Sequence, residues 1–377
     1  MKKKHILILS YSHLHKDPRI LRQIKAYIEN YTITTIAYSK SGLENFYYTI
    51  YKEPHFSLKR KLRRVIEFFI FRDYKKYYFD DFKKTLINDH INNKYDLIIA
   101  NDIQTLPLAI AISNSSKKVY FDAHEYHPEQ FNNSLYWRIK DKPYVAFLCK
   151  NYIPLADYFT TVNESIAKAY FDYLNIKPKV INNAADFHQL KANQINPSNI
   201  RLIHHGAAVL GRNLERIIDV MKYLDDKYTL DIFLAGNKTY IKKLIEYSQG
   251  INNVSVLPPI DKDKIITVSN NYDIGIYILP PTNFNSKYAL PNKVFEYMQA
   301  RLALVVSPNP EMKNFVLNNG LGICSVDYTS KALASAIKGL SLDDVINFKN
   351  ASNNKSMELS NENNFLKLKE IATFLLG

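Results

Sequence analysis

The sequence contains little cysteine and no long apolar run. Its 377 residues include two cysteines, Cys149 and Cys324, which are too few for a disulfide framework or a four-cysteine metal site. No stretch reaches 18 consecutive apolar residues, so we expect no transmembrane helix. The apolar run at residues 5–9 is shorter than the core of an export signal and predicts a buried strand. These absences favour a cytoplasmic protein.

Several common nucleotide-binding and catalytic motifs are also missing. The chain has no G-x-G-x-x-G fingerprint and no P-loop. It has no G-x-S-x-G elbow, no H-E-x-x-H helix and no aspartate pair at the spacing of a metal site. We therefore expect neither a bound metal nor a cofactor.

Positive charge is present in excess. The chain has 50 Lys and Arg against 36 Asp and Glu, a formal net charge of +14. This balance favours anionic partners such as nucleic acid, acidic lipid or phosphorylated metabolites. Residues 56–84 contain ten Lys and Arg against four Asp and Glu, so six of the fourteen net charges lie in this one segment.

Short apolar runs rich in β-branched residues alternate with stretches of helical periodicity. The expected strands are residues 5–9, 31–39, 95–100, 117–123, 158–162, 200–206, 228–236, 253–257, 272–279 and 302–307. Such alternation is typical of parallel sheets with right-handed crossovers. The sequence therefore predicts an α/β protein with two Rossmann-like, doubly wound domains that face a cleft.

A pause in this alternation predicts the domain boundary. Residues 185–199 have no strong periodicity and end in Pro and Asn. We expect a first domain over 1–180, a linker over 181–199, a second domain over 200–355, and a C-terminal helix over 356–377 that crosses back to the first domain. Ligands of open parallel sheets bind beyond the carboxyl ends of the strands, so residues just after strands are the candidates for a site.

The stretch YALPNKVFEYM, residues 288–298, gathers polar groups where a helix begins. Pro291 suits the first helical position, and the free N–H groups there favour a phosphate. Asn292 and Lys293 add donors, and Glu296 lies on the same face one turn further on. This carboxylate could accept two ribose hydroxyls. The alternative is an ordinary helix start with a solvated ion pair.

The stretch HHGAAVLGRNLERI, residues 204–217, joins an expected strand to a helix. Gly206 follows the strand and lets backbone approach a ligand closely. Arg212 is placed to hold a phosphate in bidentate fashion. A plain arginine at a helix start is the alternative.

The stretch FDAHEYHPEQ, residues 121–130, follows another expected strand. Asp122, His124, Glu125 and His127 crowd together there, but zinc pairs need further ligands at set spacing, and none is found. His124 suits contact with a hydroxyl or phosphate in the cleft. A histidine that caps the next helix is the alternative.

The loop after the first strand is also polar. Asp17 could cap the next helix, with Pro18 at its first position. This loop faces the expected cleft, on the side of the acceptor, through Ser12, His13, Asp17 and Arg19.

The basic segment 56–84 combines a helical apolar stripe with many aromatic residues. A basic helix with bulky apolar residues can lie in an anionic membrane interface, whereas basic plus aromatic composition also fits single-stranded nucleic acid. A solvated helix face is the third interpretation. The membrane interpretation assigns contacts to Lys59, Arg60, Lys61, Arg63, Arg64, Phe68 and Phe69.

Taken together, these motifs resemble the GT-B-fold retaining glycosyltransferases of family 4, many of which build bacterial surface polysaccharides. The resemblance rests on DPRILRQ, FDAHEYHP, TTVNESIAKAY, HHGAAVLGRNLERI and ALPNKVFEYMQARLALVVS, and it extends over nearly the whole chain. PNKVFEYM with the upstream HGA and GRNLE is the more specific part.

The resemblance implies roles for the donor. Glu296 is expected to bind the ribose, and Arg212 with Lys293 to hold the diphosphate. Gly206 would let the phosphate approach. The second domain would then bind the nucleotide sugar and the first the acceptor.

Further implied roles concern the sugar. His124 is expected to touch the donor sugar, and Asn292, with the backbone after Pro291, to contact the sugar or the distal phosphate. Two features depart from the family. Tyr288 stands where many relatives carry a glutamate eight residues before the ribose carboxylate, and SYSHLHKD replaces the usual glycine-rich first loop.

The expected activity is metal-independent, retaining transfer of a sugar from a nucleoside-diphosphate donor, a UDP-sugar, to a saccharide or lipid-linked saccharide. The expected location is the cytoplasm, with peripheral contact to an anionic membrane surface and no nucleic acid partner. Two alternatives stay open. One is a GT-B-fold sugar-nucleotide 2-epimerase, and the other is a basic, non-enzymatic protein that binds nucleic acid or another polyanion.

Overall fold

The computed structural model describes residues 3–40, 47–51 and 57–377. It does not describe the side chains of Lys16, Leu58, Lys59, Lys61, Leu62 and Arg64. The chain forms two compact units. The first comprises Met1–Asn182 and Phe365–Gly377, and the second comprises Asn183–Asn364.

The first unit is built on a parallel sheet with the strand order β3-β2-β1-β4-β5-β6-β7. Its strands are β1 His5–Leu9, β2 Thr32–Ala37, β3 Tyr47–Ile50, β4 Leu97–Asn101, β5 Lys118–Ala123, β6 Tyr158–Thr161 and β7 Lys179–Val180. Its helices are η1 Leu14–Lys16, α1 Pro18–Tyr27, α2 Leu58–Phe69, α3 Tyr74–Tyr78, α4 Asp81–Ile91, α5 Leu106–Ser113, η2 His127–Glu129, α6 Leu135–Tyr152, η3 Ile153–Leu155, α7 Glu164–Leu174 and α16 Asn361–Leu376.

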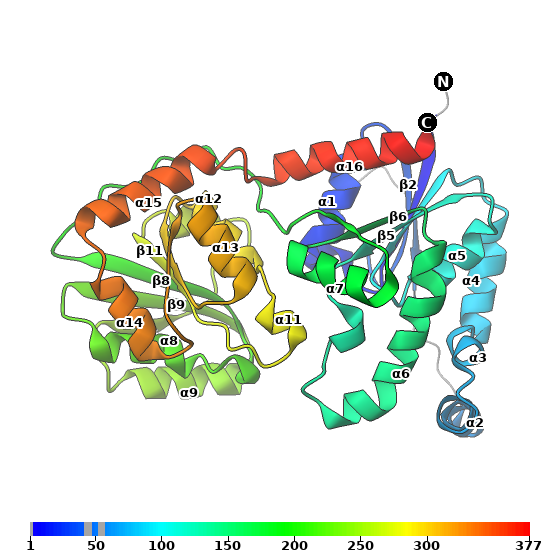
Figure 1. Cartoon of the computed structure of the whole chain (residues 1–377), viewed down its shortest axis with the longest axis horizontal. Coiled ribbons are helices and arrows are strands. Elements are labelled where there is room, and N and C mark those ends of the chain that lie inside the picture. Colours follow the sequence, from blue (N-terminus) through cyan, green and yellow to red (C-terminus); the bar gives the residue numbers. More distant parts are fainter. Residues whose placement is uncertain (1–2, 41–46, 52–56) are drawn as a thin grey trace. The chain divides into compact units, whose positions relative to one another are not determined.

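The C-terminal helix α16 completes the core of the first unit. It lies beside α1 (Figure 1), and the Tyr27 hydroxyl donates to the Leu368 carbonyl at 3.1 Å. Ile371 and Ala372 are buried in the same cluster as the β1 residues Ile6 and Ile8. The first unit therefore closes with residues from both ends of the chain.

The second unit has its own parallel sheet with the order β10-β9-β8-β11-β12-β13. Its strands are β8 Ile200–Ala208, β9 Tyr228–Gly236, β10 Val254–Leu257, β11 Ile274–Tyr277, β12 Ala303–Val306 and β13 Gly322–Cys324. Its helices are η4 Leu210–Arg212, α8 Glu215–Asp219, η5 Val220–Tyr223, α9 Lys238–Ser248, α10 Ile265–Ser269, α11 Phe284–Lys287, α12 Asn292–Gln299, α13 Pro310–Asn318, α14 Ser330–Lys338 and α15 Leu342–Lys355.

Successive residues of the central strands pack into two different hydrophobic clusters, one on each face of the sheet. Leu202 and Val305 belong to one buried cluster, while Ile203 and Leu304 belong to another. Because successive side chains point to opposite faces of a strand, the sheet is buried on both faces, as in a doubly wound fold. The prediction of two doubly wound α/β domains is confirmed.

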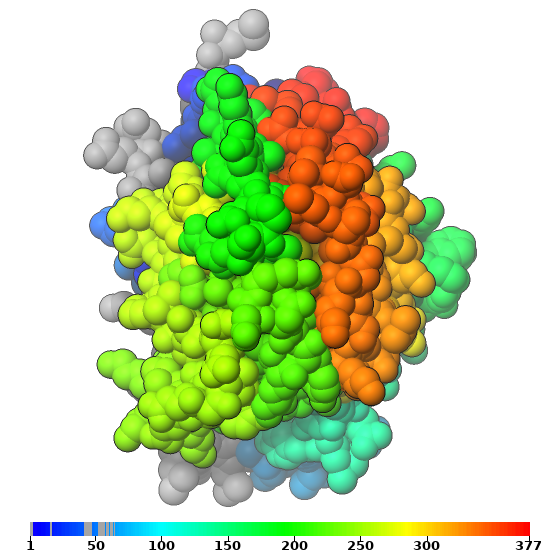
Figure 2. All heavy atoms as spheres, turned by 90° about the vertical axis from the view of Figure 1, so that its left-hand side faces the viewer, coloured from blue at the N-terminus to red at the C-terminus, as the bar shows by residue number. Residues whose placement is uncertain are grey.

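The segment that was expected to be a linker belongs to the second unit. It lies alongside α15 on the face shown in Figure 2. The Arg301 guanidinium connects the two, since it donates to the His188 carbonyl at 2.6 Å and to Asn353 Oδ1 at 3.1 Å. The Phe187 N–H donates to the Glu362 carboxylate at 2.9 Å. The chain therefore divides at 182–183 and again at 364–365, within the first turn of α16. This C-terminal helix begins at Asn361 rather than at residue 356.

Candidate functional site

In the second unit, Lys293 lies buried in the first turn of α12, beside the carboxyl ends of β8 and β11. Its Nζ donates to the His205 carbonyl at 2.7 Å and lies 3.4 Å from His204 Nε2. It also stands 4.2 Å from the centroid of the Tyr277 ring. Within the described part of the chain, no carboxylate forms an ion pair with this ammonium group.

Burial and the nearby Arg212 guanidinium lower the pKa of Lys293 to about 7. His204 Nδ1 lies 3.1 Å from the Ile276 carbonyl, so this nitrogen carries the hydrogen and Nε2 accepts from Lys293. Burial, followed by the charge of Lys293, holds the pKa of His204 well below its usual value. The two acceptors within hydrogen-bonding distance of Lys293 Nζ are therefore neutral, and the Glu296 carboxylate is the negative group that acts on its charge. An incoming anion could pair with the ammonium group.

Glu296 lies one helical turn beyond Lys293. Its carboxylate is partly exposed and its Oε2 stands 3.6 Å from His205 Nε2, which is too far for a hydrogen bond. Burial raises the pKa of Glu296, while burial and Lys293 lower the pKa of His205 to about 3. Glu296 thus keeps acceptor capacity for a ligand.

Gly206 makes room for the lysine. Its φ is +143°, and a Cβ atom there would lie 2.9 Å from Lys293 Nζ. This position therefore favours glycine for its backbone conformation, and a larger residue would also displace the ammonium group of Lys293. The sequence had suggested a different reason, the approach of a phosphate.

The remaining candidates of the second unit lie around the same turn. Arg212 is the last residue of η4 and is half-buried. Asn292 is exposed at the first position of α12. Pro291 is the N-cap with extended backbone, so its prediction as the first helical residue is wrong by one position. Tyr288 follows α11 with its ring 4.8 Å from that of Phe284.

In the first unit, His124 follows β5 and lies buried between two carboxylates. Its Nε2 is 3.1 Å from Asp122 Oδ2, and its Nδ1 is 3.5 Å from Asp102 Oδ2. Burial and Arg19 act to lower the pKa of His124, but the two carboxylates outweigh them and raise it to about 9. At neutral pH this ring is an imidazolium.

Asp102 and Asp122 have further partners that fix the cluster. Asp102, in the left-handed region with φ +66°, comes directly after β4. His127 Nε2 lies 3.5 Å from Asp102 Oδ1. Asp122 accepts from Gln23 Nε2 at 2.7 Å. Burial acts to raise the pKa of Asp102, but the two histidines hold it well below its usual value. Asp102, with 35% of its side chain exposed, is the carboxylate of the pair more open to solvent.

The loop after β1 contributes to this cluster in part. Asp17 caps α1 by accepting from the Arg19 N–H, with Pro18 at the first position, as predicted. Arg19 Nε lies 3.3 Å from Asp17 Oδ1, and the charges of Asp102 and Asp17 raise the pKa of Arg19 against its burial. Ser12 and His13 contact other partners, the Ser10 hydroxyl and the Tyr38 ring respectively.

The sequence had not singled out Asp102, His204 or Tyr277 for a site. Asp102 directly follows β4, and Tyr277 ends β11. The position after a strand was therefore the available signal. In the described residues, no group of three His, Cys, Asp or Glu side chains could hold a metal ion.

The basic helix α2 differs in part from the expectation. Phe68 is only 4% exposed, and its ring packs against Tyr74, Tyr77 and Tyr144. Its prediction as a membrane contact is therefore wrong, because it anchors α2 to α3 and α6. Phe69 is 48% exposed.

The structure describes only some of the charged side chains of α2 that were predicted to contact a membrane. Arg60 pairs with Asp81, and Arg63 Nε lies 3.1 Å from Glu67 Oε1. The side chains of Lys59, Lys61 and Arg64 lie outside the described residues. None of the described helices is both long and apolar enough to cross a membrane.

Part of the chain matches a known protein family. Residues 187–357 match the family model described as glycosyl transferases group 1. This match contains Lys293, Glu296, Arg212 and Gly206. No curated protein sequence matches the chain.

Solved structures resemble the whole chain. HepE from Anabaena, in complex with UDP-glucose, is 16% identical over 98% of this chain and 99% of its own, with a TM-score of 0.70. Sucrose-phosphate synthase from Thermosynechococcus elongatus is 13% identical over 99% of both chains, with a TM-score of 0.71. A TarM variant from S. aureus, in complex with fondaparinux, alpha-GlcNAc-glycerol and UDP, is 15% identical over 74% of this chain and 55% of its own, with a TM-score of 0.56.

The fold is that of the GT-B glycosyltransferases, and the protein is an enzyme of the glycosyltransferase class. The comparisons favour neither the epimerase nor the polyanion-binding alternative.

Proposed function

We propose that the enzyme moves a sugar from a UDP-sugar to a hydroxyl of a saccharide or lipid-linked saccharide, with retention and without a metal, in the synthesis of a surface polysaccharide. The observation that carries the proposal is Lys293, a buried lysine with Arg212 nearby and no carboxylate in an ion pair with it among the described residues. Such a group suits a diphosphate, since buried charges are normally paired. HepE, crystallised with UDP-glucose, supports UDP as the nucleotide.

Each group of the second unit has a role in this proposal. Lys293 and Arg212 hold the diphosphate and stabilise the charge that develops on it when the glycosyl bond breaks. The N–H groups at the start of α12 add to this field. Glu296 accepts the ribose hydroxyls, and Asn292 with Tyr288 lines the approach to the sugar.

The first unit supplies a fixed ionic cluster rather than a general base. His124 is protonated at neutral pH, and Asp102 is a weak base because its pKa is low. We therefore assign the acceptor proton to the departing phosphate. The bond from the sugar carbon to the phosphate oxygen breaks, the bond to the acceptor oxygen forms, and the proton passes to the phosphate. His124 acts here by holding the Asp102 and Asp122 carboxylates in place.

A thermal-shift screen of UDP-, GDP-, dTDP- and CMP-sugars tests the donor. Ligands that bind the native state raise its stability, so UDP-sugars should raise the melting temperature more than the other nucleotides. Release of UDP that depends on an added saccharide acceptor would then establish transfer. A chain that no nucleotide sugar stabilises contradicts the proposal.

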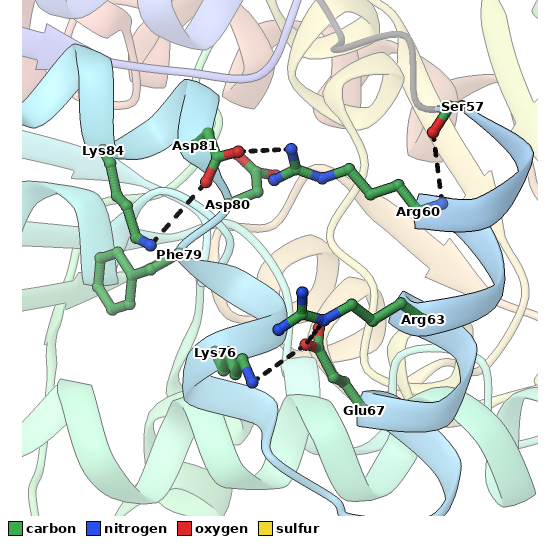
Figure 3. A pocket seen from close by; sticks show the side chains of 9 residues that line it. All are labelled: Ser57, Arg60, Arg63, Glu67, Lys76, Phe79, Asp80, Asp81 and Lys84. Atoms are coloured by element: carbon green, nitrogen blue, oxygen red, sulfur yellow. Dashed lines mark hydrogen bonds and ion pairs between the residues drawn. The ribbon is translucent and has the colours of Figure 1, made fainter.

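We also propose that α2 contacts an anionic membrane surface. Arg60, Arg63 and Glu67 share one face of the helix, and this face is turned to α3 and α4 through the Arg60–Asp81 and Lys76–Glu67 ion pairs. Val65 and Phe69 lie on the other side and are exposed. Ile70 and Phe71 follow, each 71% exposed. A helix that exposes apolar groups on the side opposite its described ion pairs (Figure 3) suits a lipid interface.

Paired variants test this contact. Phe69→Ser with Phe71→Ser should weaken binding to anionic vesicles while preserving transfer to a soluble acceptor. Leu366→Ser with Phe374→Ser is the matched control, since both residues are exposed apolar groups on α16 of the same unit. Equal losses in the two pairs would show that α2 is not the contact.

A further inference from the structure

A buried histidine lies beside the ammonium group of Lys293 in the second unit. His204, a residue of β8, is 1% exposed, and its Nε2 lies 3.4 Å from Lys293 Nζ. Its Nδ1 lies 3.1 Å from the carbonyl oxygen of Ile276 in β11. Because a carbonyl oxygen only accepts hydrogen bonds, Nδ1 carries the hydrogen, and the lone pair of Nε2 is available to the lysine.

The two neighbouring strands fix the orientation of this ring. β8 and β11 pair through Ile203 and Gly275, and His204 and Ile276 are the next residues of the two strands. The His204 ring also stacks on the ring of Tyr277, with centroids 5.8 Å apart and an angle of 23° between the planes. The hydrogen bond of Nδ1 and the stacking together hold Nε2 in one place.

Three groups surround the ammonium group of Lys293. They are the His205 carbonyl oxygen at 2.7 Å, His204 Nε2 at 3.4 Å and the Tyr277 ring, whose centroid lies at 4.2 Å. The ring attracts the cation through its quadrupole. An ammonium group has three N–H donors, so the two acceptors leave one N–H for a ligand oxygen.

The orientation of this ammonium group matters for its chemistry. A lysine is a point charge on a flexible stem, so its direction depends on the groups around it. The His205 carbonyl alone fixes one N–H and lets the other two rotate about that contact. The second acceptor, His204 Nε2, removes this freedom. Donors that are oriented in advance stabilise a developing charge without reorganising during the reaction.

We propose that His204 is a positioning residue, whose Nε2 orients the ammonium group of Lys293 so that its remaining N–H is directed at the diphosphate. This inference rests on the proposed role of Lys293 in holding the diphosphate of the donor. His204 acts through Lys293 and is not itself a ligand of the donor. Burial, followed by the charge of Lys293, holds the pKa of His204 well below its usual value, so the ring stays neutral and keeps its lone pair.

Two variants separate positioning from a purely structural role at the Ile276 carbonyl. The amide of asparagine lies at about the position of Nδ1, so His204→Asn keeps the donor to Ile276 and removes the acceptor for Lys293. The amide of glutamine reaches to about the position of Nε2, so His204→Gln keeps the acceptor and removes the donor. Positioning predicts that the glutamine variant is the more active of the two, whereas a structural role predicts the reverse order.

Steady-state kinetics with a UDP-sugar and a saccharide acceptor measure this order. His204→Asn should lower kcat about tenfold, as for loss of one hydrogen bond to a charged group, and change KM for the donor less. His204→Gln should retain most of the activity. His90→Asn is the matched control, because His90 is a buried histidine of the first unit whose Nδ1 lies 2.7 Å from the Tyr95 hydroxyl. Greater activity in the asparagine variant, or equal losses in the two His204 variants, would overturn the positioning role.

A double-mutant cycle provides a second measurement that does not need the glutamine variant. Calorimetric titration with inorganic pyrophosphate compares the original chain, His204→Asn, Lys293→Met and the chain with both changes. If His204 acts through Lys293, His204→Asn should weaken binding about tenfold in the original chain and have no further effect after Lys293→Met. Equal weakening in both backgrounds, or no weakening in the original chain, would contradict the proposal.

The cycle is separable from the proposed sugar transfer, because it measures binding alone. Coupling between His204 and Lys293 in a chain that transfers no sugar would support the positioning role and contradict the proposed transfer. Transfer from a UDP-sugar without coupling in the cycle would contradict the positioning role alone. An original chain that does not bind pyrophosphate would contradict both proposals.

Discussion

In the first unit, the protonated His124 lies between Asp102 and Asp122, whereas in the second unit Lys293 has no carboxylate in an ion pair with it among the described residues. Both groups lie near the carboxyl ends of parallel strands and both are buried. In the first cluster, the imidazolium lies within ion-pair distance of two carboxylates. In the second, Glu296 acts on the charge of Lys293 without forming an ion pair with it, and an anionic ligand would supply that pair.

Because of this difference, the two clusters are suited to different functions. A balanced cluster is rigid and poor at exchanging protons, so it suits the positioning of a sugar or acceptor. Burying a cation without an ion-pair partner costs free energy, and the binding of a diphosphate offsets this cost. The comparison therefore assigns charge stabilisation to the second unit and orientation to the first.

The largest effect is expected from Lys293→Met. Loss of the ammonium group should lower kcat by about 10²- to 10³-fold, as for loss of one donor to a developing anion, and change KM for the donor less. Steady-state kinetics measure the split, with Lys338→Met as the control because Lys338 is an exposed lysine at the end of α14 in the same unit. An unchanged kcat would remove Lys293 from the chemistry.

A smaller effect is expected from Glu296→Gln. Replacing a charged acceptor should weaken UDP binding by about 10- to 100-fold, corresponding to roughly 1.5–3 kcal/mol. Pyrophosphate binding should stay the same, because this ligand has no ribose. Calorimetric titrations with UDP and with pyrophosphate measure the two affinities. Glu246→Gln is the control, because Glu246 is an exposed glutamate of α9. Equal losses for both ligands would contradict the ribose role.

The smallest expected effects are on how the free energy of unfolding changes with pH, and they have opposite signs in the two units. The pKa of His124 is raised from 6.5 to about 9, so its stabilisation is present below pH 6.5 and is lost as pH rises through 9. The pKa of Lys293 is lowered from 10.5 to about 7, so the native state binds fewer protons than the unfolded state between these values. Its contribution to stability therefore rises with pH over that window. Each slope is about 1 kcal/mol per pH unit.

Urea unfolding between pH 7 and pH 9 should reveal this opposition. Compared with the original chain, His124→Gln should make the free energy of unfolding rise more steeply with pH, and Lys293→Met should make it rise less or fall. Hydrogen exchange, measured separately for the amides of each unit, shows in which unit the free energy of unfolding changes with pH. Slopes of the same sign in both variants would show that the two clusters do not differ as described.

The fold followed from the sequence because apolar β-branched runs identify central strands that are buried on both faces. The strands that were missed, β3, β7 and β13, all lie at sheet edges and are short. An edge strand needs fewer apolar residues, so its pattern does not stand out. The burial of Phe68 was not predicted, because it depends on the packing of α2 against α3 and on Tyr144 of α6, which is distant in sequence.

The candidate site was predictable where residues lie close in sequence. Lys293 and Glu296 share one helix turn, and Asp122 and His124 share one loop. Asp102, which raises the pKa of His124, and His204, which contacts Lys293, belong to other strands or the residues just after them, and only the sheet order brings them near. The need for glycine at Gly206 likewise depends on a lysine 87 residues later.

A crystal structure of the chain with UDP tests the central claim most directly. The account predicts diphosphate oxygens within hydrogen-bond distance of Lys293 Nζ and Arg212, and ribose hydroxyls on the Glu296 carboxylate. UDP bound elsewhere, with Lys293 still donating only to the His205 carbonyl, would contradict it.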